Sequence, residues 1–347
     1  AAGIEVWVEE NGRATKLLFS GDIGQTDRPL LRDPSVYDEA DFVVMESTYG
    51  NRRHEAKHVQ QSTLQDILKY VARNRSHVII PAFAVGRVQE LLYTLNGIIE
   101  HNLAPRMPVF VDSPLAVSAT EISERHVECF DDATRELLAR GDDPMSFPGL
   151  KLTRTVQESK AINQMAGPLM IIASSGMCTG GRIRHHLQNH LDHGKDILLF
   201  VGYQAAGTLG RYLLDGNPQV KLFGEKVRVR ARIRSLSAFS AHADVDGLLQ
   251  WLAPIKGPGG ASGPKAVFVE HGEEDAALDF AALAHRELGA PTLVPEFGET
   301  FDLSSPDEIE RRLGEMGEVW QRPAEITAAP EGGDEEEEPP ITAPAVQ

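Results

Sequence analysis

Residues 17–24 read Leu17-Leu18-Phe19-Ser20-Gly21-Asp22-Ile23-Gly24 and place an aspartate directly after a short apolar run. Apolar runs of this length are typical of buried strands, and neighbouring glycines leave the backbone accessible where the strand ends. Ligands of α/β folds are usually held at this end of a strand. The two oxygens of Asp22 can bridge two metal ions. The alternative interpretation is an aspartate that only closes a turn.

The same arrangement recurs three times along the chain. Glu46 opens Glu46-Ser47-Thr48-Tyr49-Gly50 after an apolar run, and His271 lies within residues 267–273, VFVEHGE. His242 lies within residues 237–244, SAFSAHAD. Each segment follows a predicted strand with a carboxylate or an imidazole. Four polar strand ends of complementary chemistry predict one shared site.

Strand and helix patterns alternate through the middle of the chain. Short continuous apolar runs typical of doubly covered strands occupy residues 41–45, 77–83, 108–112, 168–173 and 196–202. Helical patterns occupy residues 58–73, 87–100, 115–128, 181–193 and 207–214. This alternation predicts a doubly wound parallel sheet. Residues 3–8, 15–20, 219–223 and 226–236 alternate with period two, as antiparallel strands do. We therefore expect one α/β unit inserted into another.

Composition places few limits on the partner. The 347 residues suffice for two compact units, and no apolar run is long enough to span a membrane. Cys129 and Cys178 are far apart in the sequence, so we expect no disulfide framework and a cytoplasmic location. The net charge is −17, but seven acids fall in residues 324–347 without any Lys or Arg, which leaves −10 for the rest. Charge alone does not exclude nucleic acid.

Six motifs together resemble the β-CASP family. They are SGDIG (20–24), ESTYG (46–50), PAFAVGRVQELL (81–92), SSGMCTGGR (174–182), FSAHAD (239–244) and VEHGE (269–273), in this order. The family comprises nucleases of the metallo-β-lactamase fold with an inserted α/β domain, including the cleavage factor of mRNA 3′-end formation and its prokaryotic relatives. The resemblance extends over residues 1–303.

The resemblance implies a fold and its boundaries. We expect an αββα metallo-β-lactamase sandwich, incomplete at its N-terminus, built from residues 1–50 and 238–303. A doubly wound β-CASP α/β domain is expected at 51–237. From residue 304 the Pro- and Glu-rich sequence predicts a poorly ordered acidic tail to residue 347.

The resemblance also implies roles for single residues. Asp22 matches the family's metal-bridging aspartate, and His271 matches a terminal metal ligand. His242 matches a histidine thought to act as a general acid, and Glu46 the acid that orients it. Ser240 falls where relatives contact the substrate phosphate. An apolar residue is usual at the position of His271 in DNA-directed members, so His271 favours RNA.

These roles suit phosphodiester hydrolysis. The reaction needs a metal-activated water, a clamp on the phosphorane oxygens and a proton donor for the leaving oxygen. A histidine has an ordinary pKa of about 6.5 and serves as that donor when an acid such as Glu46 stabilises its charged form.

Part of the expected metal site is missing from the sequence. The family's His-x-His-x-Asp-His signature should precede Asp22, and a further ligand histidine should precede Ala1. Two zinc ions are expected in the intact protein, yet Asp22 and His271 are the only matched ligands in this chain. We expect that the chain is truncated upstream of Ala1 and inactive as it stands.

Residues 190–194, HLDHG, resemble the end of that signature without matching it. Gln188 stands where the first histidine belongs, and the segment follows a predicted helix rather than a strand. His186 and His190 lie four residues apart on one helix face, a spacing that can hold a metal. With no third ligand identified, we interpret them as a polar helix face.

Two further regions are candidates for substrate binding. The glycine-rich segment 174–182 follows a buried strand and opens a helix, an arrangement suited to phosphate or to a tight turn. Its candidate residues, together with Arg87 of the earlier motif, are Ser175, Gly176, Gly180, Gly181 and Arg182.

The second region is a basic stripe. Its alternating members are Lys226, Arg228, Arg230, Arg232 and Arg234. On one strand they would share a face, either as a track for the RNA backbone or as charge protecting an edge strand.

The predicted function is therefore zinc-dependent hydrolysis of RNA, endonucleolytic or 5′-exonucleolytic. The partner is RNA rather than a membrane, and a homo-oligomer or an RNA-processing complex is left open. The alternative is a non-catalytic scaffold that binds RNA or such a complex. A nucleotide-binding Rossmann enzyme would leave Asp22, Glu46, His242 and His271 unexplained.

Overall fold

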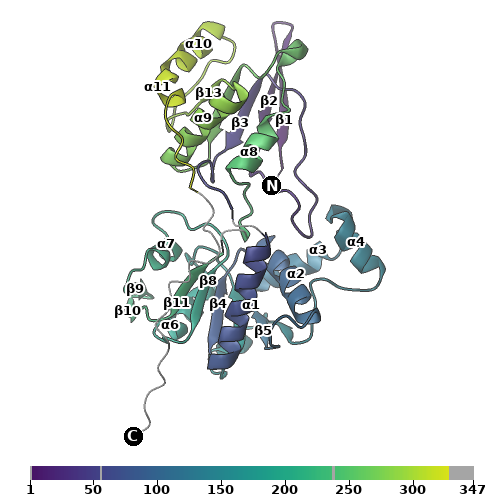
Figure 1. Cartoon of the computed structure of the whole chain (residues 1–347), viewed down its shortest axis with the longest axis vertical. Helices are drawn as coiled ribbons and strands as arrows, with labels where there is room; N and C mark the ends of the chain where they lie inside the picture. Colours follow the sequence, from purple (N-terminus) through teal and green to yellow (C-terminus); the bar gives the residue numbers. More distant parts are fainter. Residues whose placement is uncertain (1, 55–56, 237–238, 328–347) are drawn as a thin grey trace.

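The computed structural model describes residues 2–54, 57–236 and 239–327, which form two lobes (Figure 1). The upper lobe contains a five-stranded sheet in the order β1-β2-β3-β12-β13. Its strands are β1 (Ile4–Glu10), β2 (Arg13–Phe19), β3 (Phe42–Glu46), β12 (Ala266–Glu270) and β13 (Thr292–Leu293). Only β1 and β2 pair antiparallel; β2-β3, β3-β12 and β12-β13 pair parallel.

The lower lobe contains a six-stranded parallel sheet in the order β11-β8-β4-β7-β5-β6. Its strands are β4 (His77–Pro81), β5 (Val109–Val111), β6 (Leu150–Leu152), β7 (Leu169–Ala173), β8 (Ile197–Phe200) and β11 (Arg232–Ser235). A separate antiparallel hairpin joins β9 (Gln219–Leu222) to β10 (Glu225–Arg228). The lobe is continuous in sequence between β3 and the segment before α8, so one α/β unit is inserted into another, as expected.

Helices cover the sheets. In the lower lobe they are α1 (Lys57–Asn74), α2 (Arg87–Glu100), α3 (Pro114–Ser123), a short 3-10 turn (Val127–Cys129), α4 (Asp132–Ala139), α5 (Val156–Ile162), α6 (Ile183–His190) and α7 (Leu209–Leu214). In the upper lobe they are α8 (Val245–Leu252), a 3-10 turn (Pro258–Gly260), α9 (Glu274–Leu288), α10 (Pro306–Glu315) and α11 (Gly317–Trp320). Among the described residues, no helix is long and apolar enough to cross a bilayer.

Strand β4 shows why the apolar runs are continuous. Val78 and Ile80 pack in one core cluster with α1 and α2, whereas Ile79 packs in another cluster with α6. Successive side chains of a strand point to opposite faces, so both faces of β4 are buried. The prediction of doubly covered parallel strands is confirmed.

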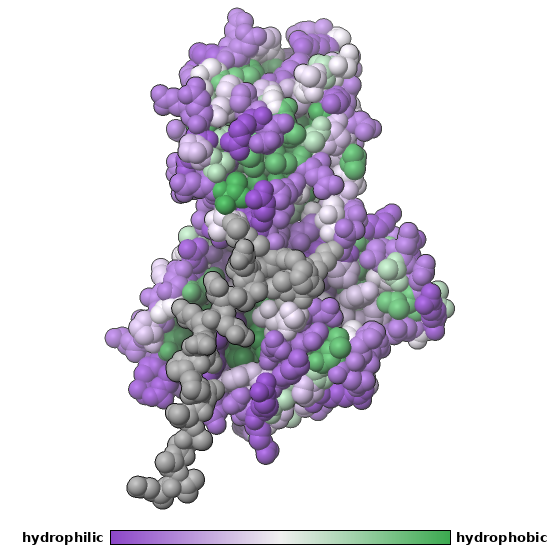
Figure 2. All heavy atoms as spheres, in the orientation of Figure 1, coloured by the Kyte–Doolittle hydropathy of each residue, from purple (hydrophilic) through white to green (hydrophobic). Residues whose placement is uncertain are grey.

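The edge strand β1 has the opposite character. Every residue of β1 is exposed, and Trp7 keeps 61% of its surface accessible. Figure 2 shows a broad apolar area on the upper lobe over the region of α8 and smaller scattered areas on the lower lobe.

The expectation of a poorly ordered tail from residue 304 is wrong for residues 306–320. Helix α10 buries Ile309 in a cluster with Phe268, and the Trp320 indole donates a hydrogen bond to Thr292 Oγ1 (2.8 Å). An amphipathic helix needs only a few apolar residues at helical spacing, which the charged composition of this stretch conceals. Residues 328–347 lie outside the described part of the chain.

The expectation that residues 226–236 form one antiparallel strand is also wrong. Residues 225–228 pair with β9 in the hairpin, whereas residues 232–235 pair in parallel with β8. Period-two alternation identifies strands but not their partners, because both kinds of pairing share the same pleat.

Close backbone packing near β3 makes a testable prediction. A Cβ added to Gly50 would lie 2.4 Å from the Ala276 carbonyl oxygen and 2.7 Å from Phe280 Cβ, so Gly50→Ala should lower the free energy of unfolding by about 1–3 kcal/mol. Gly97, inside α2, has nothing within 4 Å of such a Cβ, so Gly97→Ala should raise stability by up to about 1 kcal/mol. Denaturant unfolding measures both changes. Equal effects of the two substitutions would contradict this packing.

Candidate active site

Three parallel strands bring the sequence motifs to one edge of the upper sheet. Strand β3 ends at Glu46, directly paired with Glu270 at the end of β12, and β2 lies on the other side of β3. Asp22 follows β2 and His271 follows β12. His242 reaches the same edge from the segment before α8. One ligand atom of each of Asp22, His242 and His271 lies within 4.8 Å of the other two, so the structure brings the four motifs together.

A buried carboxylate holds the His242 ring. Glu46 is 2% exposed, and its Oε2 lies 2.7 Å from His242 Nδ1. Its Oε1 accepts a hydrogen bond from the Ile23 backbone nitrogen (2.5 Å). Both oxygens therefore have fixed partners, which sets the orientation of the imidazole.

The backbone of His242 is fixed as well. Gly24 forms an isolated antiparallel bridge with His242, and the Ala243 nitrogen donates to the Ile23 carbonyl (2.7 Å). His54 Nε2 lies 3.0 Å from the His242 carbonyl oxygen, to which it can only donate. The loop after β2 thus carries Asp22 and also positions the segment that carries His242.

The environment of His242 favours its protonated form. Burial lowers the pKa of the imidazole, but the hydrogen bond and charge of Glu46, aided by Asp22, outweigh burial and raise that pKa above its ordinary value. A proton donor working near neutral pH requires such a shift.

Thr48 is a site residue that the sequence analysis did not single out. Its Oγ1 lies 3.2 Å from His242 Nδ1 and 3.3 Å from His271 Nδ1, and it donates to the His271 carbonyl oxygen (3.1 Å). His271 Nδ1 lies 3.8 Å from Asp22 Oδ1. The hydroxyl therefore links the two imidazoles. Its place within Glu46-Ser47-Thr48-Tyr49-Gly50 was the only signal available.

The lower lobe contributes a second missed residue. Tyr203 follows β8, and its hydroxyl donates to Glu273 Oε1 in the loop after β12 (2.5 Å). Its ring lies 5.8 Å from that of Tyr49. Burial, followed by the hydrogen bond to Glu273, raises the pKa of Tyr203 to about 12, so it stays a neutral donor. No sequence pattern identifies this contact, since it joins segments 70 residues apart.

Two predicted substrate contacts are buried in this structure. Ser240 is 1% exposed, accepts a hydrogen bond from the His242 nitrogen (3.4 Å) and hydrogen-bonds Tyr49. Arg87 is 6% exposed and forms an ion pair with Glu90, which also pairs with Arg28. Both side chains support the loops around the site rather than line its surface.

The glycine-rich turn 174–182 is closed largely by its own contacts. Ser175 Oγ accepts from the Gly180 nitrogen (3.2 Å), and a Cβ on Gly176 would lie 2.7 Å from the Phe83 ring. Gly181 has a φ of +75°, where an added Cβ would lie 2.2 Å from the Ser174 oxygen. Arg182 donates to Asp112 Oδ1 and to the Arg154 carbonyl oxygen, each at 2.7 Å. These contacts explain the glycines as a tight strand–helix turn.

The interpretation of His186 and His190 as a polar helix face is wrong. His186 is fully buried, and its two ring nitrogens lie 2.7 Å from Asp112 Oδ2 and 2.7 Å from Asn163 Oδ1. His190 is 3% exposed. Helical spacing alone does not show which face is buried, because histidine suits either environment once it has a partner.

The basic stripe does not lie on one strand. Lys226, Arg228 and Arg230 are exposed on and just after β10, and Arg228 and Arg230 each approach Asp192. Arg232 belongs to β11, with its guanidinium 4.8 Å from the Tyr70 ring. Lys226 is the direct cross-strand partner of Lys221, an unfavourable like-charge pair. The hairpin part remains as an exposed surface for an anionic partner, and Arg234 is exposed separately on β11.

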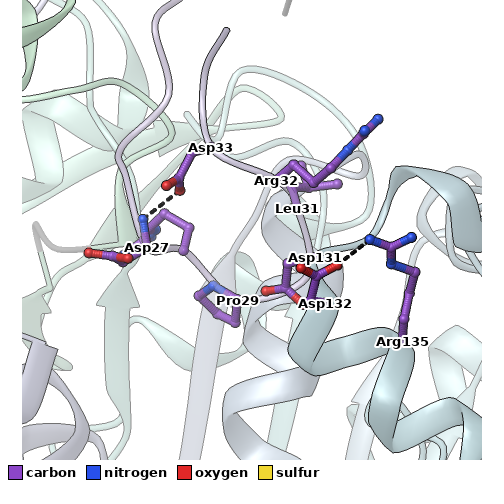
Figure 3. Close-up of a pocket in the computed structure, with 9 residues that line it drawn as sticks. Asp27, Pro29, Leu31, Arg32, Asp33, Asp131, Asp132 and Arg135 are labelled. Atoms are coloured by element: carbon purple, nitrogen blue, oxygen red, sulfur yellow. Dashed lines mark hydrogen bonds and ion pairs between the residues drawn. The ribbon is translucent and has the colours of Figure 1, made fainter. Parts of the chain in front are cut away.

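A surface hollow of about 520 Å³ lies beside the loop after Asp22 (Figure 3). Residues of this loop face the start of α4, and Asp33 accepts from the Asp27 nitrogen (2.7 Å). The Asp131 nitrogen donates to the Leu30 carbonyl (2.9 Å), which docks the loop on the lower lobe. The hollow is lined by residues of both signs and is separate from the cluster of Asp22, His242 and His271.

Comparison with known proteins agrees with this geometry. A Beta-Casp domain model matches residues 88–213, and a model described as a Zn-dependent metallo-hydrolase RNA specificity domain matches residues 226–295. The chain belongs to the β-CASP family of the metallo-β-lactamase fold. A metal cofactor is a property of this class.

Three relatives illustrate the family. The chain is 36% identical to Ribonuclease TTHA0252 of Thermus thermophilus, over 84% of this chain and 65% of the relative. It is 31% identical to an RNase J-like protein of Methanocaldococcus jannaschii, over 84% of this chain and 66% of the relative. It is 30% identical to the transcription termination factor FttA of Methanosarcina mazei, over 80% of this chain and 44% of the relative. The chain thus spans less than two thirds of each relative's length.

The residues present fit part of a zinc site. Carboxylate oxygen and imidazole nitrogen are donors that zinc prefers, and three such groups converge at Asp22, His242 and His271. A stable site needs about four donors. Because Glu46 already engages His242 Nδ1, the described residues supply only part of that donor set.

Glu46→Gln should lower the pKa of His242, because the substitution removes the charge that stabilises the imidazolium. The metal-free chain shows this in a histidine NMR titration, with Glu100→Gln on the exposed end of α2 as the control. Because the pKa of His242 is raised in the folded chain, the Glu46–His242 pair adds to the free energy of unfolding at pH values below the ordinary histidine pKa. This contribution is lost as the pH rises through the pKa that His242 has in the folded chain. An unchanged His242 pKa in Glu46→Gln would contradict the pairing.

Proposed function

We propose that this chain carries the proton donor and part of the metal site of a zinc-dependent ribonuclease that hydrolyses RNA phosphodiester bonds. The carrying observation is the Glu46–His242 pair, held beside Asp22 and His271 at one sheet edge. A buried carboxylate behind an imidazole, next to metal-type donors, suits general acid catalysis of phosphate chemistry.

Each residue has a part in this mechanism. Zinc, when bound, would supply Lewis acidity and a water of lowered pKa. Asp22 and His271 would hold the metal. His242 has Nδ1 on Glu46, so its Nε2 carries the proton for the leaving oxygen. Thr48 fixes the relative position of the His242 and His271 imidazoles through its contacts with both rings.

The substrate class follows from the relatives and the site. Two of the relatives are named as ribonucleases or ribonuclease-like, and the matched C-terminal model is described as an RNA specificity domain. We assign RNA as partner, cleaved endonucleolytically or from the 5′ end, and a cytoplasmic location. Ser240 and Arg87 would act by supporting the site, and the accessible part of the turn 179–181 would contact the RNA backbone.

A non-catalytic scaffold is not favoured. A scaffold has no need of a buried carboxylate aligned on an imidazole, and buried charges are costly to retain. The intact pair, together with the ribonuclease relatives, supports an enzyme.

His242→Ala should lower RNA cleavage by about 10²–10⁴-fold while leaving the zinc content unchanged, because the residue donates a proton and does not bind the metal. The test uses the longest natural form of the protein, a labelled single-stranded RNA and metal analysis. The exposed His126→Ala is the matched control. Loss of zinc together with activity would make His242 a ligand instead.

Replacing Lys221, Lys226 and Arg228 by Gln should weaken RNA binding equally across sequences. A phosphate backbone would relieve the repulsion between Lys221 and Lys226. Each lost phosphate contact lowers the slope of log affinity against log salt concentration by about 0.7 on a single strand. Affinity at several salt concentrations measures this. The control replaces Arg125, Arg135 and Arg140, around α4. If the hairpin only protects an edge, its variant binds RNA with an unchanged slope.

A further inference from the structure

A second group of metal-type side chains lies within the lower lobe. His77 is the first residue of β4, His190 is the last residue of α6, and Asp196 directly precedes β8. One ligand atom of each lies within 4.8 Å of the other two. His77 and Asp196 lie at the amino ends of β4 and β8, whereas the active-site loops follow the carboxyl ends of strands. The two clusters are therefore separate places in the fold.

The three histidines around Asp196 all face its carboxylate with Nδ1. His190 Nδ1 lies 2.8 Å from Oδ2, His77 Nδ1 lies 3.2 Å from Oδ1, and His193 Nδ1 lies 3.3 Å from Oδ2. Donor atoms bound at about 2.0–2.2 Å around a tetrahedral zinc are themselves about 3.3–3.5 Å apart. Two of these separations are near that value, so little movement would admit an ion.

The hydrogen bonds of His77 add an independent reason. Its Nε2 lies 3.1 Å from the Met165 carbonyl oxygen, which can only accept, so Nε2 carries a proton. Burial lowers the pKa of His77, but the hydrogen bond and charge of Asp196 outweigh burial and raise that pKa, so without a metal Nδ1 donates to the Asp196 carboxylate. A metal ion would replace this proton between the same two atoms. Metal-ligating histidines commonly donate their other N–H to a backbone carbonyl, as His77 does.

The burial of these side chains is also that of a metal site. Asp196 and His190 are each 3% exposed, whereas the His193 side chain is 63% exposed and gives an ion access from solvent.

We propose that His77, His190 and Asp196 bind a divalent transition metal such as Zn²⁺, with His193 as the fourth ligand at the surface. The ion ties β4, the end of α6 and the start of β8 together, so its role is structural. The spacing His190-x-x-His193-x-x-Asp196 supplies three ligands from one short segment. The fold adds the fourth ligand, His77, which is 119 residues from Asp196 in the sequence.

The decisive experiment compares His77→Asn with His185→Ala in the chain stripped of metal by chelator. Asn keeps a donor group toward Asp196 but is a poor zinc ligand. His185 is an exposed imidazole on α6, the helix that ends at His190, and its ring stacks on Phe223. It serves as the matched control. Zn²⁺ is added as a simple salt, and bound zinc and the thermal midpoint are measured. Co²⁺ then reports the coordination geometry by its absorption spectrum.

The unsubstituted chain and His185→Ala should each hold one zinc ion tightly, with a raised thermal midpoint and a tetrahedral Co²⁺ spectrum. His77→Asn should lose all three. Asp22→Asn should keep them, since it changes only the active site. Zinc affinity should fall as pH is lowered, because protons compete for His77.

Two results would overturn the proposal. One is equal zinc binding by His77→Asn and the control; the other is absence of tight zinc from the unsubstituted chain, with His77 titrating normally in added Zn²⁺. Either would show that a proton, not a metal, fills the gap beside Asp196. Should His77→Asn fail to fold, His193→Asn at the exposed rim gives the same readout, with at least about tenfold weaker zinc binding expected.

Discussion

Strand β3 pairs in parallel with β2 on one side and with β12 on the other, and the site depends on this pairing. Parallel strands end at the same edge of a sheet, so residues 22, 46 and 271 meet although most of the chain lies between the last two. The chain leaves the upper sheet after β3, forms the inserted lower lobe and returns to the upper sheet before β12. His242 lies on the returning segment, which explains how its ring comes to face Glu46.

The inserted lobe does more than interrupt the upper lobe. Tyr203 bonds Glu273 beside His271, and Glu90 on α2 pairs with Arg28 in the loop that begins at Asp22. Residues of both lobes therefore set the position of the site loops. A change in the relative placement of the lobes would alter the surroundings of Asp22 and His271 without touching either residue.

Buried polar networks within the lower lobe follow one physical rule. A carboxylate removed from water must be surrounded by donors, and both buried examples recruit histidines. Burial alone would raise the pKa of Asp112, but hydrogen bonds led by those from His186, Ser159 and Thr153 hold that pKa well below its usual range. Among the described residues, Asp196 has three imidazole contacts and no guanidinium contact, which leaves it the more suitable of the two for a metal ion.

The sequence by itself determined the doubly wound insertion and the three polar strand ends at Asp22, Glu46 and His271, because apolar runs and the residues that follow them are local properties. The expectation that His242 also follows a strand directly is wrong, since it lies on the segment between β11 and α8. The sequence could not determine that His186 and His190 are buried, that residues 226–236 belong to two sheets, or that α10 packs on the upper sheet. Each of these depends on a partner distant in the chain: Asp112, β8 and Phe268. Thr48 and Tyr203 became visible as site residues only in three dimensions, since a hydroxyl gains a role from what it touches. Local patterns follow from the chain, but partners follow from packing, and packing decides which polar side chains are functional.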